Sequence, residues 1–185
     1  MEYERLPDRL ETLISQSELE ERIRQLAAEI DRDFAGADPL LCVGVLKGSV
    51  FFLVDLLKQV KIPVVVDFFQ TASYGSGTTP GEVRIRKDID LSIRGRDVLL
   101  IEDIVDTGYT LRTILDLFRF RGARSVRLCA LLDKADAREV DVPIDYRGFT
   151  IDNIFVVGYG LDLDERYRNL PYIGVIQDDA APETD

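Results

Sequence analysis

The sequence contains no histidine and no tryptophan, and its 185 residues include only two cysteines and one methionine. Without histidine, Ser-His-Asp and Cys-His catalysis are excluded, and so are most zinc sites. Any proton transfer must fall to a carboxylate, a lysine or a tyrosine. Cys42 and Cys129 each lie in an apolar run, so we predict that both are reduced core residues, as expected in the cytoplasm.

Basic residues are also few, since 23 lysines and arginines accompany 34 acidic residues and give a formal net charge of −11. This charge repels phosphate backbones, so we expect no nucleic-acid partner. No apolar run approaches the ~20 residues of a membrane span, and the N-terminus lacks the apolar core of a signal peptide, so we expect no membrane partner. Length and composition predict a single domain over residues 1–185, ending in an acidic, solvated tail at 178–185.

Strand and helix patterns alternate along the chain. The spacing of Ser17 and Glu20 is that of a capping box, and apolar residues at helical spacing then predict a helix that continues to Gly36. Further helical patterns cover residues 50–57 and 111–118. The alternation predicts an α/β fold with a mainly parallel central sheet flanked by helices. Short apolar runs are predicted to form its buried strands, at residues 40–46, 62–69, 97–101 and 125–132.

Residues 70–88 interrupt this alternation with serine, threonine, glycine and proline. A segment of this length without a core-seeking face is uncommon in a compact domain and is usually functional. We predict a mobile lid loop, which can have hairpin-like ends, and the alternative is a twisted hairpin at the edge of the sheet.

The stretch 98–111 carries the clearest chemical signal. A buried strand delivers Glu102 and Asp103 at its carboxyl end, where ligands of open α/β sheets bind. These carboxylates suit ribose hydroxyls or a Mg²⁺ held mostly by substrate oxygens and water, or they simply end a strand in solvent. The backbone amides of the next loop can converge on a phosphate at a helix N-terminus. The alternative is that Asp106, the first residue of this loop, merely caps the helix. The candidate phosphate-binding residues are Asp106, Thr107, Gly108, Tyr109 and Thr110.

Residues 98–111 resemble the phosphoribosyl-diphosphate-binding signature of the type I phosphoribosyltransferases, and three further segments resemble the hypoxanthine-guanine branch, at residues 43–49, 131–134 and 155–168. The resemblance covers about residues 40–176 in order. It implies the type I phosphoribosyltransferase fold with a small base-binding hood, Mg²⁺ as cofactor, and a homodimer or homotetramer. It also implies a purine salvage activity, in which phosphoribosyl diphosphate and hypoxanthine or guanine give IMP or GMP and pyrophosphate.

The resemblance implies roles for the residues that handle the donor. Asp106 is the general base, residues 106–110 hold the 5-phosphate, and Glu102 and Asp103 bind the ribose hydroxyls with magnesium close by. The peptide before Lys47 is often cis in this family. The residues expected to contact pyrophosphate are Lys47, Gly48 and Arg168.

On the base side, Lys134 is expected to donate to the purine O6, Phe155 to stack on the ring, and the Val156 backbone to bind its edge. Asp162, at the base-binding end, is expected to serve a second magnesium ion. The residues that match the lid are Ser73 and Tyr74.

This assignment agrees with the chemistry, because displacement of pyrophosphate builds positive charge on the sugar and negative charge on the leaving group. A buried ammonium at Lys134 rejects adenine and uracil but leaves hypoxanthine, guanine and xanthine unresolved. A xanthine phosphoribosyltransferase therefore remains an alternative. Another is a regulator of the same fold that senses nucleotides and binds RNA, which needs a basic face.

Several matching residues also have plainer interpretations. Lys134 can be a solvated lysine, Lys47 can pack along a turn, and Arg168 can belong to a surface ion pair. Tyr159 is an alternative stacking ring. The sequence departs from relatives at two positions, since Tyr109 replaces a polar or basic residue and Ile154 replaces a lysine.

Overall fold

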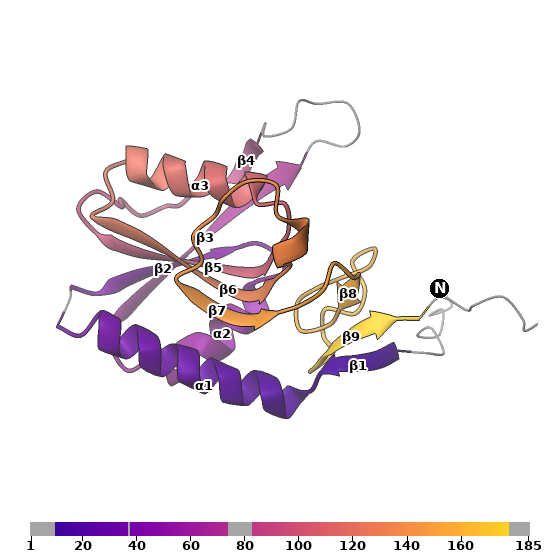
Figure 1. The fold of residues 1–185 in the computed structure, drawn as a ribbon. Helices are drawn as coiled ribbons and strands as arrows, with labels where there is room; N and C mark the ends of the chain where they lie inside the picture. Colours follow the sequence, from indigo (N-terminus) through magenta and orange to yellow (C-terminus); the bar gives the residue numbers. More distant parts are fainter. Residues whose placement is uncertain (1–9, 37, 74–82, 178–185) are drawn as a thin grey trace, which may run out of the picture.

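The computed structural model describes residues 10–36, 38–73 and 83–177, and a six-stranded sheet lies at its centre (Figure 1). The strand order is β4-β3-β2-β5-β6-β7. All neighbouring strands are parallel except β3 and β4, which pair in antiparallel fashion. The strands are β2 (Leu40–Val45), β3 (Val64–Ser73), β4 (Val83–Lys87), β5 (Asp97–Val105), β6 (Ser125–Asp133) and β7 (Tyr146–Thr150).

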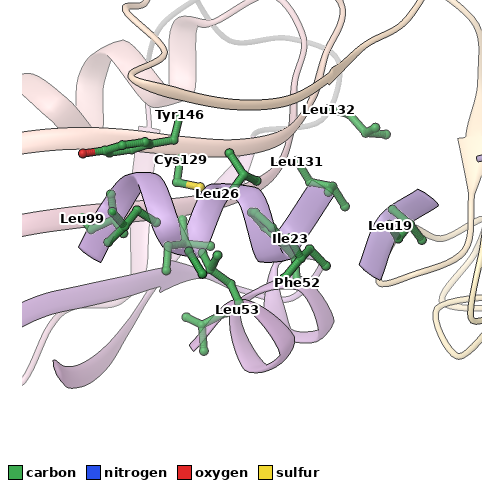
Figure 2. Close-up of a cluster of buried hydrophobic side chains, with 14 of the residues drawn as sticks. Leu19, Ile23, Leu26, Phe52, Leu53, Leu99, Cys129, Leu131, Leu132 and Tyr146 are labelled. Atoms are coloured by element: carbon green, nitrogen blue, oxygen red, sulfur yellow. The ribbon is translucent and has the colours of Figure 1, made fainter. Parts of the chain in front are cut away.

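Helices cover both faces of this sheet, as predicted. Helices α1 (Gln16–Asp33) and α2 (Val50–Gln59) lie on one face, and α3 (Tyr109–Phe120) lies on the other (Figure 1). Alternate residues of β5 enter opposite cores, because successive side chains of a strand point to opposite faces. Leu99 packs with the first two helices and Leu100 with α3. Figure 2 shows Leu99 in the same cluster as Ile23 of α1 and Phe52 of α2.

The start of α1 differs from the prediction. Ser15, rather than Ser17, is the N-cap, and its side chain and that of Glu18 form the capping box. The sequence offers two overlapping pairs with capping-box spacing, Ser15 with Glu18 and Ser17 with Glu20, and the structure uses the first. The helix also ends at Asp33, before Gly36.

A second, smaller sheet forms the hood, which consists of residues 10–14, 156–157 and 173–176. Its strands β1 (Leu10–Ile14), β9 (Ile173–Ile176) and β8 (Val156–Val157) pair in antiparallel fashion in that order. The hood lies beyond the carboxyl ends of the central strands (Figure 1). It therefore closes the edge at which an α/β sheet binds ligands.

The predicted lid segment, 70–88, has paired strands at both ends. Residues 70–73 belong to β3 and residues 83–87 to β4, and these strands pair in antiparallel fashion, so the ends of the segment are hairpin-like. Its role as a lid stays a prediction. Tyr74 and the acidic tail at 178–185 lie outside the described residues, and the assignment of residues 1–185 to one domain stays a prediction. None of the helices in the described part of the chain combines the length and apolar character needed to cross a bilayer.

Candidate active site

Three segments that are distant in sequence meet at the carboxyl end of β5. A Cβ atom added to Gly48 would lie 1.6 Å from Oδ2 of Asp103, and one added to Gly160 would lie 2.0 Å from the Gly48 carbonyl oxygen. Only glycine fits at both positions. The turn after β2, the end of β5 and the turn after β8 are thus in direct contact. The strand itself runs on to Val105, so the predicted carboxylate pair lies within β5 and not at its last residue.

The residues expected to contact pyrophosphate come together here. Arg168 donates to the Gly160 carbonyl at 2.7 Å and pairs with Asp162 at 2.8 Å. The ammonium group of Lys47 lies 2.9 Å from a carboxylate oxygen of Glu165, which also pairs with Arg168 at 3.1 Å. The Leu46–Lys47 peptide is cis, as the family resemblance implies. Two cations and their carboxylate partners therefore form one polar network.

The carboxylates of Glu102 and Asp103 in β5 are partly buried and poorly compensated. Burial raises the pKa of Glu102 well above its ordinary value, and the charge of Asp103 adds to this effect. Burial also raises the pKa of Asp103 to about 6, against an opposing hydrogen bond from the Ile104 amide. One carboxylate oxygen of Glu102 is buried without a hydrogen-bond partner among the described residues. Such a group is costly in a folded protein unless a ligand uses it.

The loop from Asp106 to Thr110 enters α3 through Gly108, which has a φ of +93°. Its left-handed backbone favours glycine, and an added Cβ would also meet the Val140 carbonyl oxygen at 2.9 Å. The Asp106 side chain is exposed, so its carboxylate is open to an incoming ligand. A hydrogen bond to Glu139 raises the pKa of the Tyr109 hydroxyl.

The residues expected to bind the base lie on β6 and β8. Lys134 directly follows β6 and is buried, with 8% of its surface exposed, so it is not the solvated lysine of the plainer interpretation. Phe155 is 55% exposed, whereas Val156 is buried in the hood. Tyr159 is a poor alternative stacking ring, because it is buried and its hydroxyl donates to Asp55 at 2.8 Å.

Comparisons with known proteins give the family of this chain. A family model described as the phosphoribosyl transferase domain matches residues 11–164. This chain belongs to the phosphoribosyltransferase family.

Among curated phosphoribosyltransferases, the hypoxanthine-guanine phosphoribosyltransferase of Bacillus subtilis is 47% identical over 89% of this chain and 92% of its own length. The bifunctional protein TilS/HprT of Listeria monocytogenes is 53% identical over 89% of the chain, which spans only 26% of that relative's length. The family and the fold class predicted from the sequence are thus confirmed.

Solved phosphoribosyltransferase structures show the same fold. A hypoxanthine-guanine phosphoribosyltransferase from Bacillus anthracis superposes with a TM-score of 0.87 at 43% identity, covering 90% of this chain and 98% of that one. A hypoxanthine phosphoribosyltransferase from Trypanosoma cruzi, solved as a ternary substrates complex, gives a TM-score of 0.86 at 38% identity, covering 90% of this chain and 94% of that one.

Sequence reasoning missed three residues of this phosphoribosyltransferase site. Glu165 bridges Lys47 and Arg168, but it lies in a turn whose left-handed backbone at Glu165 (φ +63°) no sequence pattern announces. The other two are Asp133 and Arg138, a buried pair beside the phosphate loop. The position of Asp133, directly before Lys134 at the end of an apolar run, was a usable signal. If such a carboxylate is buried, it needs a charged or hydrogen-bonding partner.

A cavity of about 510 Å³ lies elsewhere in the phosphoribosyltransferase fold, between α1, α2 and the turn that follows β8. Phe51, Asp55 and Tyr159 are among its lining residues. Apart from Tyr159, the alternative stacking ring, none of the predicted site residues lines it, so the cavity is distinct from the strand-end site.

Proposed function

We propose that this protein is a purine salvage enzyme that transfers the 5-phosphoribosyl group of phosphoribosyl diphosphate to hypoxanthine or guanine. The products are IMP or GMP and pyrophosphate. The observation that carries the proposal is the contact between the Lys47–Gly48 turn and Asp103 of β5, next to a loop whose amides are open to an anion. The relatives, named as hypoxanthine-guanine phosphoribosyltransferases, support the substrate class.

In this proposal Asp106 is the general base. The purine ring nitrogen forms a bond to C1 of the ribose while the bond from C1 to the pyrophosphate oxygen breaks, and the proton of the ring N–H passes to Asp106. Its exposed carboxylate, at the entrance to α3, supports this role. The amides and hydroxyls of residues 106–110 hold the 5-phosphate, and Lys47, Gly48 and Arg168 bind the leaving pyrophosphate.

The chain's own residues fit a magnesium ion at this edge. The unpartnered buried oxygen of Glu102 and the charged form of Asp103 are both stabilised by a nearby cation. No group of three ligating side chains in residues 10–36, 38–73 and 83–177 forms a ready cage, which suits Mg²⁺ held mainly by substrate oxygens and water. Bound Mg²⁺ would neutralise charge on the leaving pyrophosphate. Asp162, whose two oxygens already meet Arg168 and the Glu165 amide, serves the second ion.

The base site follows from Lys134 and the hood. The Lys134 ammonium donates to O6 of the purine, Phe155 stacks on the ring and the Val156 backbone binds its edge. Adenine presents an amino donor at this position and leaves the ammonium group unpaired. Ile154, which replaces a lysine of relatives, packs against the core. This position therefore offers the base no positive charge.

We further propose a cytoplasmic homodimer or homotetramer without nucleic-acid or membrane partners. The exposed Phe51 and Val54 of α2 support self-association. Ser73, at the end of β3, and Tyr74 belong to the segment that covers the site during transfer.

An assay of free bases tests the proposal directly. Purified protein with phosphoribosyl diphosphate and Mg²⁺ is expected to consume hypoxanthine and guanine, and to leave adenine and uracil unchanged. Turnover of xanthine alone would favour the alternative branch. No turnover of any base, together with salt-dependent retention of the protein on RNA, would favour the RNA-binding regulator over the enzyme.

A further inference from the structure

Three consecutive peptide carbonyls, those of residue 105 at the end of β5 and of residues 106 and 107 in the phosphate loop, accept hydrogen bonds from the segment that follows β6. The donors are the Lys134 amide to Val105 (3.0 Å), Nε of Arg138 to Asp106 (2.9 Å), and the Glu139 and Val140 amides to Thr107 (3.0 and 3.1 Å).

This arrangement fixes the direction of the loop's amides. In a planar trans peptide, the C=O and N–H groups point in opposite directions. Because the carbonyls of Asp106 and Thr107 face the segment at 138–140, the N–H groups of Thr107 and Gly108 face away from it. Neither amide has a hydrogen-bond partner among the described residues. They are therefore oriented for a phosphate before it arrives.

Arg138 is the one side chain among these donors, so a substitution can remove it without changing the backbone. Its guanidinium also contacts the Val105 carbonyl at 3.4 Å and pairs with Asp133. Asp133 is buried, with 3% exposed, and its second oxygen pairs with Arg147 at 2.8 Å. A planar guanidinium held by a buried carboxylate has little freedom, so it fixes the carbonyls rigidly.

We propose that Arg138 is a positioning residue for transfer, anchored by Asp133, and that it orients the phosphate loop without touching the substrate. The inference rests on the proposed function. Because Asp133 lies directly before Lys134, the same ion pair joins the base-selecting lysine to the backbone of the general base, Asp106. Arg138 thereby links the two halves of the site.

The test compares Arg138→Lys with wild-type protein and with Arg119→Lys. The control changes an arginine of α3 that pairs with Asp116 on the surface. Titration calorimetry measures the binding of two ligands. GMP is expected to contact the phosphate loop, and inorganic pyrophosphate with Mg²⁺ is expected to bind at the opposite end of the site. We expect Arg138→Lys to weaken GMP binding roughly tenfold or more. It should also raise the KM for phosphoribosyl diphosphate by a larger factor than the KM for guanine. Pyrophosphate binding should stay within about twofold of wild type, and the control should change neither ligand.

A second variant, Asp133→Asn, keeps the inference open to refutation if Arg138→Lys fails to fold. It leaves Arg138 present but unanchored, so we expect a smaller loss of GMP binding and again no loss of pyrophosphate binding. Equal losses of both ligands would indicate a general structural role and overturn the inference, as would unchanged GMP binding. If wild-type protein binds neither ligand and transfers the phosphoribosyl group to no base, the proposed function fails as well.

Discussion

Replacing Asp103 with asparagine should stabilise the metal-free protein at neutral pH while removing activity. Burial raises the pKa of this carboxyl from its ordinary value of 3.8 to about 6. The folded state therefore binds the Asp103 proton more tightly than the unfolded state does. Stability from this proton is fully present below pH 3.8 and is lost as the pH rises through about 6.

The size of the effect follows from the same pair of values. Their difference corresponds to about 3 kcal/mol at neutral pH, at about 1.4 kcal/mol for each pH unit. Partial exposure of the side chain screens part of this free energy, so we expect Asp103→Asn to gain about 1 to 3 kcal/mol near pH 7.5. Near pH 4, where the wild-type group is largely protonated when folded, the gain should shrink to roughly 0.5 kcal/mol.

Urea denaturation in a chelator, near pH 7.5 and near pH 4, measures both differences. The exposed Asp38→Asn variant is the matched control and should change stability little at either pH. Adding Mg²⁺ and pyrophosphate should restore the stability of wild-type protein more than that of Asp103→Asn. A variant no more stable than wild type near pH 7.5, or equally stabilised at both pH values, would show that Asp103 is not a strained, desolvated carboxylate.

Three further substitutions test the proposed roles. Asp106→Asn should lower kcat by at least ~10²-fold with little change in donor binding, because the general base is lost; normal turnover would remove Asp106 from this role. Lys134→Met should relax the discrimination between guanine and adenine in kcat/KM, and an unchanged ratio would mean that the lysine does not contact O6. Glu165→Gln should tighten pyrophosphate binding roughly threefold, because it frees Lys47 and Arg168 of a competing carboxylate; calorimetry that finds equal or weaker binding contradicts this.

Strands β2, β5 and β6 of the central sheet could be predicted from the sequence because they are largely buried, whereas the edge strands β4 and β7 were not predicted. Strands β2 and β6 are short apolar runs bounded by turns, so pattern and length agree. The hood could not be predicted in the same way. Its strand β1 has only five residues and pairs with β9, which lies some 160 residues further along the chain, so no local pattern specifies the partner.

Motif spacing located the site, but not the contacts that shape it. The sequence around Glu102 predicted carboxylates at a strand end, and the structure adds that Gly160 packs against Gly48 and Gly48 against Asp103. Ion pairs such as Arg138 with Asp133 depend on where a turn directs each side chain. An arginine five residues after an aspartate has no distinctive spacing, so it becomes informative only once the turn is known.

The distribution of charge explains how an acidic chain can bind a polyphosphate. Several arginines distant from the site, such as Arg121 and Arg124, are neutralised by Asp88 and Asp97. At the end of β5 the balance is reversed, because Glu102 has an unpartnered buried oxygen and Asp103 is desolvated. A fold selected for stability alone would not retain such groups. These carboxylates repel a bare phosphate, so under the proposed function we expect the donor to enter with Mg²⁺ and to be attracted by the local, outward-facing amides of residues 107 and 108.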